Sequence, residues 1–335
     1  GERVLGFAVK HPAVPLAELS MAEVESGLRF LGIVGFIDPP REEAITAVAE
    51  CRSAGIEVKM ITGDHAATAA AIAEQLGLGE KPAVLTGSEL DRLSEEELAP
   101  AVRQTAVYAR TSPEHKRRIV RALQPTGAVI AMTGDGVNDA PSLKQAGVGV
   151  AMGGKGTEAA KEASQMILLD DNFASIVAAV KEGRTVFDNI RKVITWTLPT
   201  NGGEALTVIA AILFNFTLPM SATHILWINM VTTVTLGLVL AFEPTEPNIM
   251  RRPPRRAGAG LLTPLLVWRV AFVAIVFALC GLGIFFYALG SGLSLELART
   301  MVVNMIVVLE AVYLFNVRYM HMTSFTWRGA LGTPP

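Results

Sequence analysis

Three short clusters of carboxylate, hydroxyl and basic side chains lie in the first half of the 335-residue chain. The first is Thr62-Gly63-Asp64, where a hydroxyl and backbone amides after a strand can hold phosphoryl oxygens. Such a triplet is also common in ordinary turns. The second contains Arg110 and Lys116 around Pro113, which suits the first turn of a helix. Lys116 could neutralise phosphate charge, or both residues could belong to a solvated basic helix face.

The third cluster is the glycine-rich run from Thr133 to Pro141. Asp135, Asn138 and Asp139 supply two carboxylates and an amide within five residues. Oxygen ligands at this density suit Mg²⁺, which takes one or two carboxylates plus a phosphate and keeps several waters. The alternative is a turn rich in Asp and Asn. Two glycines, a strand before the turn and a helix after it favour a Mg²⁺ site.

Alternating β-rich and helical runs are expected to position these clusters. The expected strands of this pattern cover residues 31–37, 57–61, 106–109, 128–132 and 148–151, after a separate strand at 4–9, and the expected helices cover 42–54, 66–76, 113–123 and 142–146. This alternation predicts a parallel sheet with helices on both faces. Such sheets bind ligands at the carboxyl ends of their strands, where both Thr-Gly-Asp triplets fall.

The second half of the chain is apolar, and it contains four segments long enough to span a membrane. These segments cover residues 193–216, 219–242, 264–289 and 297–317. Arginines between the second and third segments, including Arg251, Arg252, Arg255 and Arg256, predict a cytoplasmic loop. The soluble half is then cytoplasmic too, and so is the C-terminus.

Polar side chains inside these segments are candidates for an ion site, because a charge in the bilayer core costs several kcal/mol. They are Asn201 and Glu204 in the first segment, Asn229, Thr232 and Thr233 in the second, and Glu310 in the fourth. Oxygen ligands converging from three helices would form a dehydrating cation site. The alternative is polar packing between helices.

Charge and cysteine content exclude some classes of protein. The net charge of −2 gives no indication of nucleic acid as a partner. Cys51 and Cys280 lie in different halves, so a disulfide framework is not expected and a reducing cytosolic face is. The chain begins without methionine or a secretory signal, and we expect it to be a piece of a longer protein.

Several motifs together resemble the P-type ATPases, in particular the type II cation pumps. They are Asp38-Pro39-Pro40-Arg41, Met60 to Asp64, Arg110 to Lys116 and Met132 to Pro141, in the order found in that family. The resemblance covers essentially the whole chain. It implies an α/β haloacid-dehalogenase-like phosphorylation domain followed by transmembrane helices. In that family an aspartate attacks the γ-phosphate of ATP, and the acyl phosphate is later hydrolysed.

The resemblance also implies roles for individual residues. Asp135 would bind Mg²⁺, with Asn138 and Asp139 supporting the metal and phosphate site. Lys116 would neutralise charge on the transferred phosphoryl group. Thr62 and Gly63 would contact that group and Asp64 would orient their loop. Arg110 would join these residues in binding ATP, and Asp38 would lie at the hinge towards the nucleotide-binding domain.

The ion site resembles that of the family's calcium pumps at Asn201, Glu204, Asn229, Thr232 and Glu310. Those pumps have an aspartate where this chain has Thr233, and that aspartate bridges two ion sites. Losing its charge puts binding of two Ca²⁺ ions in doubt. One divalent ion, or a monovalent cation such as Na⁺, becomes an alternative.

Two family motifs are absent from the sequence: the phosphorylated Asp-Lys-Thr-Gly-Thr and the Thr-Gly-Glu of the actuator domain. We therefore expect this chain to be inactive without the N-terminal part of the same pump. The resemblance divides the chain into the end of the nucleotide-binding domain (1–30), the phosphorylation domain (31–171), a stalk helix (172–192), the transmembrane domain (193–317) and a cytoplasmic tail (318–335).

Two other classes compete with an ATP-driven cation pump. A membrane-anchored phosphatase would need its own nucleophilic aspartate, and none lies in a suitable motif. A non-catalytic relic of a truncated gene would agree with the missing motifs. The pump, with Ca²⁺ as its expected ion and a bacterial plasma membrane as its expected location, best explains the intramembrane Glu204 and Glu310.

Overall fold

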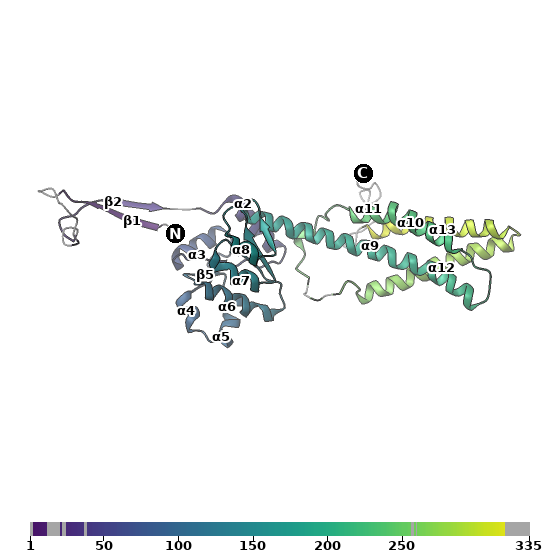
Figure 1. The fold of residues 1–335 in the computed structure, drawn as a ribbon, viewed down its shortest axis with the longest axis horizontal. Helices are drawn as coiled ribbons and strands as arrows, with labels where there is room; N and C mark the ends of the chain where they lie inside the picture. Colours follow the sequence, from purple (N-terminus) through teal and green to yellow (C-terminus); the bar gives the residue numbers. More distant parts are fainter. Residues whose placement is uncertain are drawn as a thin grey trace. The chain divides into compact units, whose positions relative to one another are not determined.

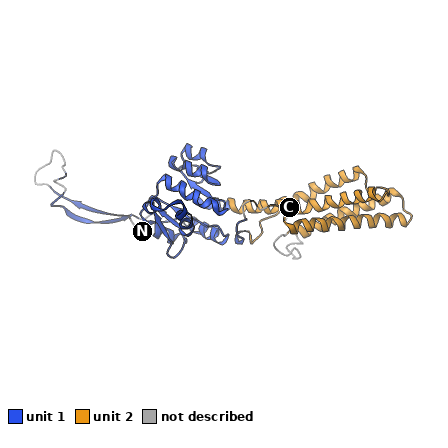
Figure 2. Ribbon diagram, turned by 90° about the horizontal axis from the view of Figure 1, so that it is seen from below, with its two compact units in different colours: residues 1–178, 250–257 blue, residues 179–249, 258–335 orange. Residues whose placement is uncertain are grey.

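The computed structural model describes residues 3–11, 21, 25–36, 39–255, 258 and 260–318. The chain divides into two units (Figure 2). Unit 1 contains residues 1–178 and 250–257, and unit 2 contains residues 179–249 and 258–335. Asp38, Arg256 and the tail from residue 319 onward lie outside the described residues, and with them the predictions made there.

Unit 1 begins with an antiparallel hairpin of β1 (Arg3–Val9) and β2 (Arg29–Phe36) (Figure 1). The strand expected at 31–37 was placed in the parallel sheet, and this placement is wrong, because β2 pairs with β1. Antiparallel strands can pair without the helical crossover that parallel neighbours require. The apolar side chains of the hairpin, such as Phe30 and Ile33, are exposed.

The rest of unit 1 contains two three-stranded parallel sheets where one sheet was expected. The first has the order β3-β5-β4, with β3 at Met60–Ile61, β4 at Val84–Thr86 and β5 at Val107–Ala109. The second has the order β6-β7-β8, with β6 at Ala131–Gly134, β7 at Val148–Met152 and β8 at Met166–Leu168. Ile61 packs against the hydrophobic clusters of both sheets, so their cores are continuous.

Helices connect the strands, as the alternating pattern predicted. They are α2 (Glu42–Ser53), α3 (Ala66–Gln75), α4 (Gly87–Arg92), α5 (Glu95–Gln104), α6 (Pro113–Leu123), α7 (Ala140–Gln145) and α8 (Glu158–Ala163). The short elements β4, α4, α5, α8 and β8 were not expected. Helix α5 carries a capping-box signal, since the Ser94 hydroxyl accepts from Glu97 N and the Glu97 carboxylate accepts from Ser94 N.

Helix α9 (Phe173–Leu213) is continuous over 41 residues and belongs to both units. Its first turn packs in unit 1, where Phe173 and Val177 contact Ala47 and Cys51 of α2. The residue range expected for the stalk and most of the first expected span therefore lie in one helix. Pro199 lies inside α9 without ending it.

Unit 2 is helical. After α9 come α10 (Ala222–Thr232), a π-helical segment η3 (Thr233–Gly237), α11 (Leu238–Ala241), α12 (Pro264–Gly290) and α13 (Leu295–Val317). Among the described residues, three helical stretches are long and apolar enough to cross a membrane: Ala222–Ala241, α12 and α13. The first expected span (193–216) falls mostly in the last part of α9, which is not among these three stretches, so the four-span count stays a prediction.

Candidate functional site

The loops after β3 and β5 are joined through Thr62 and Asp64. The Thr62 hydroxyl donates to Asp64 Oδ2 at 2.8 Å and accepts from the backbone N–H of Asp64 at 3.1 Å. The backbone N–H of Arg110 donates to the Asp64 carbonyl at 3.1 Å, and that of Thr111 to the Thr62 carbonyl at 3.3 Å. The space beside Gly63 is open. This loop therefore presents its backbone next to room for a ligand.

Lys116 connects this region to the loop after β6. Its ammonium group lies 2.6 Å from Asp139 Oδ1. Helix α6 places Lys116 here, because Pro113 occupies its first turn and Ser112 caps it by accepting from the His115 N–H. The structure thus brings the second and third clusters of the sequence together.

Asp139 organises the loop that contains Asp135. Asp139 is 6% exposed, and its carboxylate Oδ2 accepts from the backbone N–H groups of Asp135 and Gly136, both at 3.3 Å. A Cβ atom at position 134 would lie 2.6 Å from Asp139 Cβ. The absence of a side chain at Gly134 therefore allows the Asp139 side chain to pack directly against the backbone of the loop.

The residues around Asp135 fit Mg²⁺ in one specific way. Both Asp139 oxygens are already hydrogen-bonded, so Asp139 positions the loop and Lys116 rather than offering a free ligand. The exposed Asp135 carboxylate has no hydrogen-bond partner within the described ranges. Nor do those ranges contain three His, Cys, Asp or Glu side chains grouped to hold a metal by themselves. One carboxylate with phosphate oxygens and water is a common Mg²⁺ environment. Asn138 is exposed beside it.

The sequence analysis missed a glycine-rich loop that contacts Asp135. The backbone N–H of Thr157 donates to the Asp135 carbonyl at 2.8 Å. The loop is held by Asp171, whose carboxylate accepts from Gly154 N at 3.0 Å and Lys155 N at 2.9 Å. These backbone hydrogen bonds, above all that of Gly154, keep the pKa of Asp171 below its ordinary value. The signal available was the Gly153-Gly154-Lys155-Gly156 run after a strand.

A second cluster lies inside unit 2, where α9, α10 and α13 bring Glu204, Asn229, Thr232 and Glu310 together. Glu204 is 2% exposed and Glu310 is 1% exposed. The Asn229 side-chain amide donates to Glu204 Oε2 at 2.7 Å, and the Thr232 side chain interacts with the Glu310 carboxyl group. Glu204 Oε1 and Glu310 Oε2 are buried without a hydrogen-bond partner in the described part of the chain. Orphaned buried carboxylate oxygens are costly, and a cation could satisfy both.

Asn201 and Thr233 do not share this burial. Both side chains are exposed, although Asn201 lies three residues before Glu204 and Thr233 directly follows Thr232. Adjacent residues of a helix point about 100° apart, which separates Thr232 from Thr233. Thr233 begins the π-helical segment η3, an irregularity that is frequent at functional sites. Their roles as cation ligands stay predictions.

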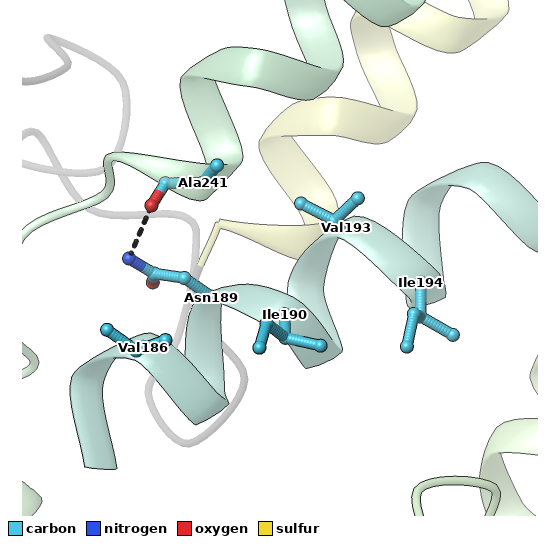
Figure 3. A pocket seen from close by; sticks show the side chains of 6 residues that line it. All are labelled: Val186, Asn189, Ile190, Val193, Ile194 and Ala241. Carbon is cyan, nitrogen blue, oxygen red and sulfur yellow. Dashed lines mark hydrogen bonds between the residues drawn. The ribbon is translucent and has the colours of Figure 1, made fainter. Parts of the chain in front are cut away.

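A pocket near the start of unit 2 is a different kind of site (Figure 3). Its walls are mainly the apolar side chains Val186, Ile190, Val193, Ile194 and Ala241. The Asn189 amide, its polar member, donates to the carbonyls of Ala241 at 3.1 Å and Glu243 at 2.8 Å. Its lining contains no carboxylate, and its one side-chain oxygen is the Asn189 amide oxygen, so it resembles a cation site less than the Glu204 and Glu310 cluster does.

Both halves of the chain match known protein families. Residues 217–334 match the family described as cation transporting ATPase, C-terminus. Residues 7–147 and 117–180 match haloacid dehalogenase-like hydrolases. The chain is 53% identical over 333 residues, 98% of its length, to the Probable cation-transporting ATPase F of Mycobacterium tuberculosis H37Rv. It belongs to the P-type cation-transporting ATPase family.

Two further relatives of this chain come from other bacteria. The Cation-transporting ATPase pma1 of Synechocystis is 45% identical over 95% of the chain, and the Calcium-transporting ATPase of Bacillus subtilis is 48% identical over 75% of it. The chain spans 37%, 35% and 28% of the lengths of the Mycobacterium, Synechocystis and Bacillus proteins, respectively. Its family and its apolar helices make it a membrane protein.

Proposed function

We propose that the protein containing this chain is an ATP-driven cation pump that works through an aspartyl-phosphate intermediate. The observation that carries the proposal is the pair of buried carboxylates, Glu204 and Glu310, on different helices. They occur in the same chain as three strand-end loops that hydrogen bonds connect and whose residues could hold a phosphoryl group. Helix α9 contains Glu204 and also forms part of unit 1.

In unit 1, we assign the chemistry to residues that can hold a phosphoryl group and its charge. The backbone around Thr62 and Gly63 would contact phosphoryl oxygens, with Asp64 fixing the Thr62 hydroxyl and Arg110 beside the loop. Lys116 would stabilise negative charge. Mg²⁺ bound at Asp135 would neutralise phosphate charge when ATP is present. The nucleophilic aspartate would come from a part of the protein outside this sequence.

In unit 2, the donor set favours a hard cation. Glu204 and Glu310 supply carboxylates, and Asn229 and Thr232 supply neutral oxygens, which are ligands typical of Ca²⁺. We propose one bound Ca²⁺ ion, because Thr233 supplies no charge. Na⁺ is the alternative, since a hydroxyl in place of a carboxylate lowers the site's negative charge. Asn201 and Thr233 would complete the coordination from their exposed positions.

For the membrane topology, we propose four spans, with the last part of α9 as the first. The arginines between α11 and α12, including Arg251, Arg252 and Arg255, would lie in the cytoplasm. Unit 1 would then be cytoplasmic, in a bacterial plasma membrane. A membrane-anchored phosphatase is the second candidate, but it would not require carboxylates buried between helices.

Cation-stimulated ATP hydrolysis by the full-length protein tests this proposal. Purified protein would be assayed with Ca²⁺, Na⁺, K⁺, Mn²⁺ or excess Mg²⁺. One cation should stimulate hydrolysis, and Glu204→Gln or Glu310→Gln should raise the concentration needed at least tenfold. Glu296→Gln is a matched control, because Glu296 is exposed in the first turn of α13. ATP hydrolysis that responds to no cation would reject the pump.

A further inference from the structure

Two buried hydrogen bonds link α9 to α13 next to the carboxylate cluster. The indole N–H of Trp196 on α9 donates to the backbone carbonyl of Glu310 on α13 at 3.1 Å. The hydroxyl of Tyr313 on α13 donates in return to the backbone carbonyl of Thr195 on α9, also at 3.1 Å. Both rings are buried, and Trp196 is almost completely so.

The placement of these bonds restricts how the two helices can move. Their partners are adjacent residues on α9 and residues three apart, on one face, of α13. One contact would allow α13 to rotate or slide about it. Two contacts in opposite directions fix both the rotation and the axial position of α13 relative to α9.

Glu310 is held at its backbone while its carboxylate remains in the cluster. Helical side chains lean towards the N-terminus of their helix, so the carboxylate extends away from the level of its own carbonyl. The Trp196 indole binds the carbonyl, and the carboxyl group interacts with Thr232. The indole therefore does not compete for the orphaned oxygen Oε2.

The surroundings make the two bonds specific. Trp196 and Tyr313 belong to one apolar cluster with Leu240 and Phe277. The Phe277 and Tyr313 rings pack edge to face, with their centroids 6.2 Å apart. Arg269 donates to the Tyr313 oxygen at 3.2 Å, which leaves the phenol O–H free to donate to Thr195. In an apolar environment, an indole N–H or phenol O–H without a partner is costly.

We propose that Trp196 and Tyr313 are positioning residues that set the cation affinity of the pump by fixing Glu310 opposite Glu204. This inference rests on the proposed function and goes beyond it, because neither residue offers a ligand to the ion. If the register of α13 changes, the carboxylates separate and the ion loses one of them. Turnover at saturating cation should then persist, since the phosphate chemistry belongs to unit 1.

The test uses the full-length protein with Trp196→Phe and Tyr313→Phe, which keep a ring but remove the donor. Each should raise the half-saturating cation concentration about tenfold, with maximal ATPase activity within about twofold of wild type. Because both bonds fix the same register, the double variant should raise the half-saturating cation concentration by less than the product of the two single increases. Trp268→Phe and Tyr287→Phe are matched controls, since these rings are 62% and 66% exposed on α12.

Several outcomes would overturn the proposal. One is an unchanged half-saturating concentration in both variants while Glu310→Gln raises it. Another is a lower melting temperature with wild-type cation affinity, which would show a purely structural role. If Trp196→Phe does not fold, Tyr313→Phe alone decides the question. A wild-type protein without cation-stimulated ATPase activity would instead reject the proposed function, so the two failures can be told apart.

Discussion

Asn229 donates a 2.7 Å hydrogen bond to Glu204 Oε2, and the same side-chain nitrogen donates to the Ile225 carbonyl at 3.1 Å. Asn229 therefore orients the Glu204 carboxylate from α10 while its own amide oxygen is left available. Glu204 Oε1 has no hydrogen-bond partner among the described residues. This arrangement holds one carboxylate oxygen and leaves two other oxygens for a ligand.

Replacing Asn229 by Leu should weaken cation binding by orders of magnitude rather than abolish ATP chemistry. The change removes both a ligand oxygen and the donor that holds Glu204, which together are worth about 2–4 kcal/mol. We expect at least a thirtyfold rise in the half-saturating cation concentration. Asn304→Leu on α13 is the comparison, because Asn304 is exposed and lies outside this cluster. A wild-type affinity for Asn229→Leu would remove Asn229 from the site.

Replacing Lys116 by Met should destabilise the protein, because Asp139 keeps its buried charge but loses its cation. Lys116 is about one quarter exposed, so we expect about 1–3 kcal/mol rather than the full cost for a buried pair. Lys161→Met is the matched control, since Lys161 is equally exposed but pairs with the exposed Glu158. Thermal or urea unfolding would measure both. Equal effects of the two changes would contradict a structural role for the Lys116–Asp139 pair.

Adding a single methyl group at position 134 should disturb the loop of Asp135. The new Cβ of Gly134→Ala would lie 2.6 Å from Asp139 Cβ, so Asp139 or the backbone must shift. We expect a loss of about 1–3 kcal/mol and at least a tenfold loss of ATPase activity. Gly183→Ala in α9 is the control, because its Cβ meets open space and alanine favours helix. Activity at the wild-type level in Gly134→Ala would show that the loop tolerates displacement.

The Asp171 carboxylate should contribute stability that depends on pH. Backbone N–H groups, first that of Gly154, hold its folded-state pKa below the unfolded value of about 3.9. Its contribution is therefore fully present above the unfolded pKa and is lost as the pH falls through the folded pKa. Asp171→Asn should lower the melting temperature at pH 7, and the difference from wild type should shrink towards acid pH. Asparagine tolerates the left-handed backbone here (φ 51°), so the change removes the charge and one of the two acceptor oxygens without straining the backbone. A difference that is constant with pH would contradict this account.

Local signals explain which parts of the fold could be predicted. Pro113 and the Ser112 cap define α6 to the residue, because helix starts are set by neighbouring side chains. The short β8 and α8 carry too few residues for a periodic pattern. The apolar pattern of β2 predicts a strand, but it does not identify the partner strand. The sequence therefore did not show that β2 pairs with β1.

The residue types of the carboxylate cluster could be predicted from the sequence, but not which way each side chain points. Glu204 and Glu310 stood out because charges are rare in apolar segments. Whether Asn201 or Thr233 points towards them depends on how each helix is rotated against its neighbours. The bond from Trp196 to Glu310 joins residues 114 positions apart, and nothing local indicates it. Buried ion pairs such as Lys192–Glu246 and Arg318–Glu243 were missed for the same reason.

ATP-driven cation uptake into sealed proteoliposomes tests the central claim most directly. Vesicles containing the full-length protein would receive ATP, Mg²⁺ and the cation that stimulates hydrolysis. Wild type and the exposed-site control Glu296→Gln should accumulate the cation, and Glu204→Gln with Glu310→Gln should not. Accumulation by the double Gln variant at the wild-type rate would contradict a transport site formed by these two buried carboxylates.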